Sequence, residues 1–313
     1  SARAITAISQ VSSLISEVSQ PPPQLQIPEE LPKASESALA FLKDISEDDF
    51  RYLVFDDELI TYSDDGKQVG HYKMSVTPTR RGGLNCLLVE ASSEGSVDGV
   101  PCGTSVTAYI TFTLDTVEQK HNEYVKLENH PIQRNTHISR QDQGYQVNKD
   151  VQQGQTHESF SKMFEYAHMD GFITEGANLL LQRLLVTKGL PSYLELLSFD
   201  ADTNLCLASY SELGDRIQPV GDSSVTVFGI QRTIHSFSNL PTTWQTYFMS
   251  DGHLITRTQV GSPVTMKVST IPKLVEPDDF LPKPTFEPVA LTIEDDMEMF
   301  SKYLERKDEL QAD

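Results

Sequence analysis

The sequence predicts an α+β fold, in which a mostly antiparallel β-sheet packs on one central helix and an amphipathic helix extends on a proline-rich arm at each end of the chain. Short runs rich in β-branched and aromatic residues, separated by turn residues, predict the sheet. One internal segment with helical apolar periodicity predicts the central helix. Prolines gathered near both ends predict the arms, because proline-rich stretches are extended and semi-rigid.

The length and composition are those of a folded chain with a body and two extensions. At 313 residues, with 38% hydrophobic and 22% charged residues, the chain can build a substantial core. We expect a helix and linker over residues 1–34, a strand-rich body over 35–271, and an extended tail with a docking helix over 272–313. No apolar run approaches the roughly 20 residues that span a bilayer, and the first residues do not resemble a secretory signal.

The N-terminal extension predicts an amphipathic helix followed by a spacer. Its apolar residues with helical spacing are Ile5, Ile8, Val11, Ile15 and Val18. The stretch PPPQLQIPEELP then excludes a regular helix, because proline lacks the backbone N–H. Two alternatives follow for the helix: it folds back on the body, or its apolar face docks on another protein.

The body begins with a helix over residues 35–46, SESALAFLKDIS, whose first serine is the expected N-cap. β-strands then predominate. In the first half we expect strands over residues 51–63, 67–77, 84–93 and 104–114. The expected turns there are Asp64-Asp65-Gly66 and PTRRGG, and the polar segment 115–155 predicts strands with long connections. In the second half we expect strands over residues 193–200, 204–210, 224–237, 243–250, 253–260 and 263–271.

The segment GFITEGANLLLQRLLVTKGLP, residues 171–191, predicts the central helix. Its periodic apolar residues are Ala177, Leu180, Leu181, Leu184 and Leu185. Gly189 and Pro191 predict its end. Glu175 and Asn178 lie one turn apart, which leaves two alternatives: a buried polar contact, or the solvent-facing side of the helix.

The C-terminal extension has the same plan as the N-terminal one. Its prolines predict a tail that does not pair as an inner strand: Pro272, Pro277, Pro282, Pro284 and Pro288. The last segment, LTIEDDMEMFSKYLERKDEL, predicts a helix with a capping-box pattern over residues 292–295 and one apolar stripe. We predict that both terminal stripes bind protein, through Ile293, Met297, Phe300, Tyr303, Leu304, Ile5, Ile8, Val11 and Ile15.

The charge of the chain limits its possible classes of binding partner, and its cysteine content indicates its cellular compartment. With 45 acidic and 25 basic residues the net charge is −20, which disfavours nucleic acid and anionic membrane surfaces as partners. The three cysteines form no metal-site or disulfide pattern. Cys86 and Cys206 lie in apolar strand patterns and are expected to be buried as small hydrophobic residues. A reducing compartment, cytosolic or ciliary, is the expected location.

The motif search predicts no enzyme, no cofactor and no metal. The nucleophile-elbow, P-loop, dinucleotide-binding and HExxH patterns do not occur. His121, His130, His137 and His157 fall in the polar middle, where a metal site formed on folding is the alternative to scattered surface histidines. Because their spacing matches no ligand motif, we favour scattered surface histidines.

The stretch YFMSDGHLITRTQVGSP, residues 247–263, has two interpretations. Ser250 or Ser262, with Asp251 and His253, would supply the groups of a hydrolase. The dipeptide Asp-Gly between two alternating runs instead favours a β-hairpin, with a turn whose two central residues both have positive φ. We favour the hairpin, because neighbouring residues of one strand end do not by themselves give a nucleophile and base their mutual geometry.

Several blocks resemble the CATIP family of ciliogenesis-associated proteins. They are LVFDDELITYSDDGKQVGHYKMSV, CLLVEASSEGSVDGVPCGTS, GFITEGANLLLQRLL, YFMSDGHLITRTQVGSP and EDDMEMFSKYLERKDEL, in order over residues 35–313. The resemblance implies a non-enzymatic protein of the cilium or flagellum that interacts with a tetratricopeptide-repeat protein. It also implies association with actin polymerisation during ciliogenesis, and with radial spokes of the axoneme.

The strand-rich body also has a looser resemblance to the curved half-barrels of lipoprotein-sorting carriers, which implies a curved, half-barrel-like sheet around the central helix. We therefore expect a structural or adaptor component of the axoneme, with a role in cilium assembly and motility, located in the cytoskeleton and cytoplasm. The alternatives are a cytosolic regulator of actin polymerisation and a half-barrel module that binds an apolar ligand. Neighbouring spoke proteins, a tetratricopeptide-repeat protein and the actin machinery are the expected partners.

Overall fold

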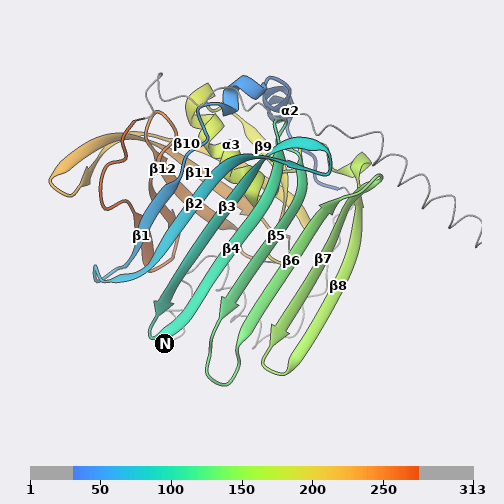
Figure 1. The fold of residues 1–313 in the computed structure, drawn as a ribbon, viewed down its shortest axis with the longest axis horizontal. Helices are drawn as coiled ribbons and strands as arrows, with labels where there is room; N and C mark the ends of the chain where they lie inside the picture. Colours follow the sequence, from blue (N-terminus) through green and yellow to red (C-terminus); the bar gives the residue numbers. More distant parts are fainter. Residues whose placement is uncertain (1–30, 238, 275–313) are drawn as a thin grey trace, which may run out of the picture. The chain divides into compact units, whose positions relative to one another are not determined.

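The computed structural model describes residues 31–237 and 239–274, in which fourteen strands form one antiparallel sheet (Figure 1). The spatial order is β8-β7-β6-β5-β4-β3-β2-β1-β14-β13-β12-β11-β10-β9. The strands are β1 (Asp57–Ser63), β2 (Gln68–Arg81), β3 (Leu84–Val97), β4 (Val100–Thr111), β5 (Thr116–Val125), β6 (Ile132–Arg140), β7 (Gly144–Gln153), β8 (Thr156–Glu165), β9 (Leu194–Phe199), β10 (Leu205–Val220), β11 (Ser223–His235), β12 (Thr242–Phe248), β13 (Leu254–Gln259) and β14 (Val264–Lys267). Each strand pairs with the next one along the chain except β8 with β9, which form the two edges of the sheet, and β14 pairs with β1.

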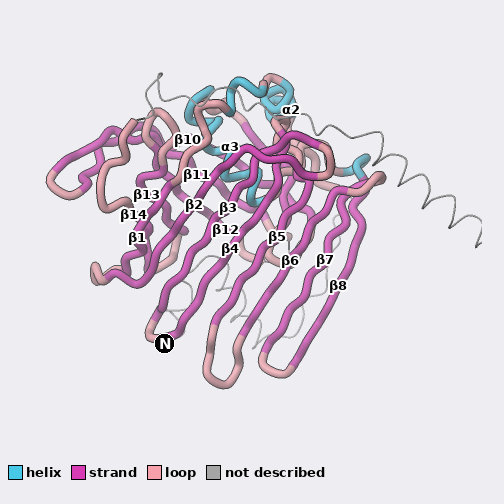
Figure 2. The backbone as a smooth tube through the Cα atoms, viewed as in Figure 1, coloured by secondary structure: helices cyan, strands magenta, loops and turns pink. Residues whose placement is uncertain are grey.

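The helical segments gather towards one end of the strands, and the β3–β4, β5–β6 and β7–β8 turns lie at the other end (Figure 2). They are α2 (Glu36–Lys43), η3 (Glu47–Phe50), η4 (Tyr166–His168) and α3 (Glu175–Lys188). The side chain of Ser35 caps α2 by accepting from the N–H of Ala38, as the sequence predicts. Within the described ranges, no helix has the length and apolar character needed to cross a membrane.

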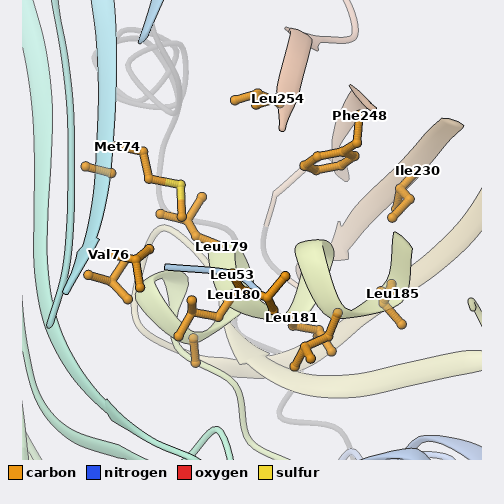
Figure 3. Packing of buried hydrophobic residues seen from close by; sticks show 14 of the residues in the cluster. Leu53, Met74, Val76, Leu179, Leu180, Leu181, Leu185, Ile230, Phe248 and Leu254 are labelled. Atoms are coloured by element: carbon orange, nitrogen blue, oxygen red, sulfur yellow. The ribbon is translucent and has the colours of Figure 1, made fainter. Parts of the chain in front are cut away.

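The central helix α3 is buried on every side. All ten residues from Gly176 to Leu185 are buried, including the predicted apolar stripe. Leucines of α3 pack between Met74 and Val76 of β2 on one side and Phe248 and Ile230 of the other half of the sheet (Figure 3). Two halves of one sheet therefore enclose the helix, which is why its polar side is buried as completely as its apolar side.

A buried ion pair holds α3 in this position. The Nη2 atom of Arg183 donates to Oδ2 of Asp57 at 2.7 Å, and each side chain is 1% exposed. Nη1 of Arg183 donates to the carbonyl oxygens of Leu53 and Phe55, at 2.7 and 3.1 Å. The other carboxylate oxygen of Asp57 accepts from the N–H of Leu254 at 3.2 Å. One pair of charges thus connects α3 with the chain before β1 and with the start of β13.

The two edge strands of the sheet meet at a seam of aromatic side chains. Phe199 of β9 packs on Phe164 of β8 and on Phe172, with both pairs of ring centroids 4.7 Å apart. Phe172 also forms an isolated parallel bridge with Leu197. The predicted mostly antiparallel sheet on a central helix is confirmed. The sheet curves until its edges touch, but β8 and β9 are not paired, so the barrel is not closed by hydrogen bonds.

Several local predictions were wrong, and β8 and residues 211–220 of β10 were not predicted as strands. Residues 51–56 are not part of β1, because the carbonyls of Leu53 and Phe55 bind Arg183 instead of a neighbouring strand. Residues 78–81 belong to β2, and the turn is confined to the two positive-φ glycines Gly82 and Gly83. In the polar segment 115–155 the connections between strands are short, not long, because cross-strand pairing extends almost to each turn.

The predicted terminal helices and most of their proline-rich arms lie outside the described residues. The boundaries proposed for the three regions, at residues 34/35 and 271/272, stay predictions. Cys86 and Cys206 are fully buried and free, as expected, and Cys102 is also buried and free.

We predict that Arg183→Met lowers the free energy of unfolding by about 3–5 kcal/mol, because it leaves the Asp57 carboxylate buried without its partner. Arg81→Met is the matched control, since it removes an arginine that is 48% exposed from its pair with Glu118 and should cost about 1 kcal/mol or less. Urea denaturation of the two variants measures the difference. Equal losses would contradict a special role for the buried pair.

Candidate functional site: a charged cavity beside the central helix

None of the nine predicted protein-binding residues of the two terminal stripes falls within residues 31–237 or 239–274. Ile5, Ile8, Val11 and Ile15 precede the described range, and Ile293, Met297, Phe300, Tyr303 and Leu304 follow it. They stay sequence predictions.

The hairpin at Asp251-Gly252 is present, but its turn differs from the predicted one. Gly252 has φ 93°, whereas Asp251 is not among the residues with positive φ. The loop is wider than two residues, and the N–H of Met249 donates to the carbonyl of His253 at 2.8 Å. Nδ1 of His253 lies 2.9 Å from Oδ2 of Asp251, and the imidazole stacks on Phe55 at 4.0 Å. The pair braces the turn against the chain before β1.

Of the four histidines of the polar middle, His130 lies in the β5–β6 connection, and the other three lie on separate strands and contact different polar groups. His121 hydrogen-bonds Thr104, His137 contacts Glu118, and His157 faces Asp150. Within residues 31–237 and 239–274, no group of three or more His, Cys, Asp or Glu side chains is placed to hold a metal ion.

Several buried or half-buried charged side chains line two adjoining hollows inside the curved sheet. The hollows share the wall residues His121, Glu175 and Ile234. The centre of a water-sized sphere can occupy about 50 Å³ in the first hollow and about 60 Å³ in the second, and the wider empty space of about 580 and 560 Å³ includes open solvent. The first lies between β2–β5 and β11–β14, beside the N-terminal end of α3. Its lining is Tyr72, Ala91, Ser92, Ser93, Thr104, Val106, His121, Glu175, Leu179, Arg232, Ile234, Trp244, Arg257 and Met266.

Glu175, the first residue of α3, holds two arginines in the first hollow. Its Oε2 lies 2.6 Å from Nη1 of Arg232, and its Oε1 lies 3.5 Å from Nη2 of Arg257. Burial alone would raise the pKa of Glu175, but the attraction of the two arginines outweighs it and lowers the pKa. The helix is placed for this by Thr174, whose side chain caps it, and by Gln119, which accepts from the N–H of Gly176 at 2.8 Å. The carboxylate is therefore ionised and fixed.

Asn178 continues this polar network along α3. It is fully buried, and its Oδ1 accepts from Tyr210 at 2.8 Å and from Gln182 at 3.1 Å. Its amide donates to Glu175 at 3.3 Å. Of the two alternatives for Glu175 and Asn178, the structure shows the buried polar contact.

The second hollow is more polar and lies under the β9–β10 turn. Nη1 of Arg134 and Nζ of Lys149 donate to the carbonyl of Ala201, at 3.1 and 2.8 Å. Arg134 also lies 3.8 Å from Glu123, and both side chains are at least nine-tenths buried. Among the described residues, Nε of Arg134 and Oε1 of Glu123 have no hydrogen-bond partner. Two cations from β6 and β7 thus reach across the interior and hold the turn beyond β9.

For the first hollow, the sequence contains a sign that Arg232 is buried, which the prediction from sequence did not use. In SVTVFGIQRTIHSF, Ile230, Arg232 and Ile234 alternate and must point to the same side of β11. An arginine between two apolar residues of one strand face is a candidate for a buried charge. Its partner Glu175 lies 57 residues away, so the sequence alone does not identify the pair.

A second surface of interest is the outer edge of β8. Every residue of β8 except Phe164 is exposed, and β8 is the terminal strand in the sheet order. The opposite edge, β9, is covered: the N–H of Ser35 donates to Glu195 at 2.9 Å, and the N–H of Leu197 donates to Gly171 at 3.0 Å. Within the described residues, two long exposed strand edges therefore remain: β8, and residues 211–220 of β10, which extend beyond β9 and pair only with β11.

The chain matches one protein-family model and has close relatives. Residues 37–263 match the model described as the N-terminal domain of ciliogenesis-associated TTC17-interacting protein. A Xenopus laevis relative described as ciliogenesis-associated TTC17-interacting protein is 41% identical over 285 residues, covering 90% of this chain and 76% of the relative. A Danio rerio relative of the same description is 40% identical over 293 residues, covering 90% and 81%.

Among solved structures, a β-barrel-like protein from Brucella abortus, belonging to a domain family of unknown function (DUF1849), is similar at a TM-score of 0.44 and 8% identity. The likeness covers 68% of this chain and 94% of that one. At this score it supports no statement about function.

We predict a pH-dependent contribution from Lys149. Burial first, and then the charge of Arg134, lower the pKa of Lys149 from its ordinary value of 10.5 to about 8. Between these two values the unfolded chain binds a proton that the folded chain has lost, so the stability of the folded state rises with pH. Relative to that of Lys149→Met, the free energy of unfolding of the wild type should increase by about 1–3 kcal/mol as the pH rises over this range.

Urea denaturation of both proteins at several pH values from 7.5 to 10 measures this gain, because all other titrating groups are common to the two. A stability difference that stays constant with pH would contradict a lowered pKa at Lys149.

Proposed function

The chain belongs to the family of ciliogenesis-associated TTC17-interacting proteins, and from this premise we propose that it is a non-enzymatic adaptor in cilium assembly. The observation that carries the proposal is the extent of the likeness: it spans the strand-rich body with 40–41% identity to relatives whose names state both ciliogenesis and TTC17 binding. We propose that this chain likewise binds TTC17, a tetratricopeptide-repeat protein.

The finer part of the proposal is that the chain is a structural subunit of the axoneme, in a radial spoke, with a role in motility. A large sheet whose helix is locked by a buried ion pair is suited to hold attached segments at fixed positions. The terminal stripes are the proposed docking segments. Burying Met297, Phe300, Tyr303 or Leu304 on a partner would contribute about 1.5–3 kcal/mol per side chain before ordering costs.

The exposed β8 edge supports the same role. An edge strand presents unpaired N–H and C=O groups, to which an extended segment of a partner can add as a further strand. His157, Glu158 and Lys162 on β8 limit pairing with unrelated chains, because charged side chains disfavour nonspecific edge-to-edge contacts.

The axonemal proposal predicts that the protein stays with the pellet when cilia are demembranated and washed in moderate salt. Quantitative mass spectrometry of pellet and soluble fractions measures this, and the protein should fall in proportion with spoke proteins in axonemes that lack spokes. Release into the soluble fraction would contradict a structural subunit. A changed actin polymerisation rate with purified protein would then favour the cytosolic regulator.

We predict that Phe300→Asp together with Leu304→Asp abolishes co-precipitation with TTC17 or retention in the axoneme, because two charges interrupt the apolar stripe. Lys302→Ala with Arg306→Ala on the same segment is the control and should retain binding. Circular dichroism should show an unchanged body for both proteins. Normal binding and retention of the Asp variant would remove this stripe as a docking surface.

A further inference from the structure

The first hollow combines an apolar wall with a surplus of positive charge. Its apolar side chains come from β3 and β4 on one side, from β11, β12 and β14 on the other, and from α3: Ala91, Val106, Leu179, Ile234, Trp244 and Met266. Two guanidinium groups, of Arg232 and Arg257, face the single carboxylate of Glu175. The two arginines and the glutamate together give the described wall one net positive charge next to an apolar surface.

The two arginines differ in the lengths of their hydrogen bonds to the protein. Arg232 has a 2.6 Å contact with Glu175 and donates to Ser198 at 3.3 Å. Arg257 has only long contacts among the described residues, 3.4 Å to Oη of Tyr72 and 3.5 Å to Glu175. A guanidinium has five N–H donors, and hydrogen bonds weaken at such lengths, so Arg257 has donors to spare.

The position of Arg257 is nevertheless fixed. Its guanidinium lies over the Trp244 ring at 4.5 Å from the centroid and over the Tyr72 ring at 5.6 Å. Its side chain is 12% exposed. Stacking holds the planar fork while leaving its edge available, which is the arrangement that binds a carboxylate with two parallel hydrogen bonds.

A second observation independently indicates a polar ligand group. Nε of Arg232 is buried and has no hydrogen-bond partner among the described residues, and Arg232 is 3% exposed. A buried donor without a partner is costly. Because Nε has almost no exposed surface, Arg232 must shift for a ligand acceptor in the hollow to reach this atom and recover that cost.

We propose that this hollow is a binding site for a small amphipathic organic acid. The carboxylate binds Arg257, with Arg232 beside it, and the apolar body lies along the wall formed by Ala91, Val106 and Met266. One surplus positive charge next to Glu175 suits a singly charged carboxylate better than a doubly charged phosphate. This site goes beyond the adaptor role and does not depend on it.

Trp244 provides a direct probe, since it is the only tryptophan in the chain and lines the hollow. Titration of the full chain with decanoate, below its micelle concentration, should give a saturable change in tryptophan fluorescence with one ligand bound by native mass spectrometry. Decan-1-ol should bind at least about tenfold more weakly, because it lacks the charge-assisted hydrogen bonds. The cation decyltrimethylammonium should bind more weakly still.

Arg257→Met should lower decanoate affinity about tenfold and abolish the preference over decan-1-ol, while Glu175 keeps its short contact with Arg232. Arg80→Gln, on the exposed β2–β3 hairpin, is the control and should leave all affinities unchanged. Ala91→Leu removes no charge but fills the hollow, so it should weaken decanoate and decan-1-ol alike.

Equal binding of the three probes, or no saturable signal, would overturn the proposal. So would an unchanged decanoate affinity in Arg257→Met. If that variant fails to fold by circular dichroism, Ala91→Leu decides: decanoate affinity within twofold of the wild type would place the ligand elsewhere and overturn the proposal.

Discussion

The Arg183–Asp57 pair joins residues that lie 126 positions apart in the sequence, and the interior is arranged around it. A buried charge must keep its partner, so α3 cannot rotate or slide without leaving a carboxylate uncompensated. The same guanidinium binds the carbonyls of Leu53 and Phe55, so these residues do not pair with a neighbouring strand. The same carboxylate binds the N–H of Leu254 and so fixes the start of β13. Because the helix is held in this way, its first residue, Glu175, projects into the interior at a fixed point.

The curvature of the sheet and the charge inside it are parts of one arrangement. Enclosing a helix with a single sheet brings β8 and β9 together, where Phe164, Phe172 and Phe199 pack without a hydrogen-bonded ladder. On the same side, Arg134 and Lys149 reach the β9–β10 turn. The gap between β8 and β9 is closed by side chains and not by backbone pairing, and polar side chains take part in closing it. A closed barrel filled with apolar residues would have no such polar hollow. The gap also leaves the β8 edge as an exposed strand, and the second hollow borders the same opening through Ser198 and Phe199 of β9.

Sequence patterns predicted the elements whose evidence is local. The period of Ala177, Leu180 and Leu184 and the stop at Gly189 give the central helix, and alternation with turn residues gives the strands. The errors fall where distant residues compete for local groups, as at residues 51–56, whose carbonyls bind Arg183. The hairpin at Asp251-Gly252 was correctly predicted but its turn was not, because His253 and Phe55 stack and widen the loop.

The sequence by itself determined the fold class, most of the antiparallel strands, the identity of the central helix and the burial of Cys86 and Cys206, because hydrophobic periodicity and turn chemistry act between near neighbours. It did not identify β8, whose residues are almost all exposed, or residues 211–220 of β10. Only the tertiary structure decided that the polar side of α3 is buried, that Glu175 meets Arg232 and Arg257, and that a hollow lies beside them. These contacts join side chains 57 and 82 residues apart. Their existence depends on how far the sheet curves, which is set by packing around the whole helix and not by any one segment.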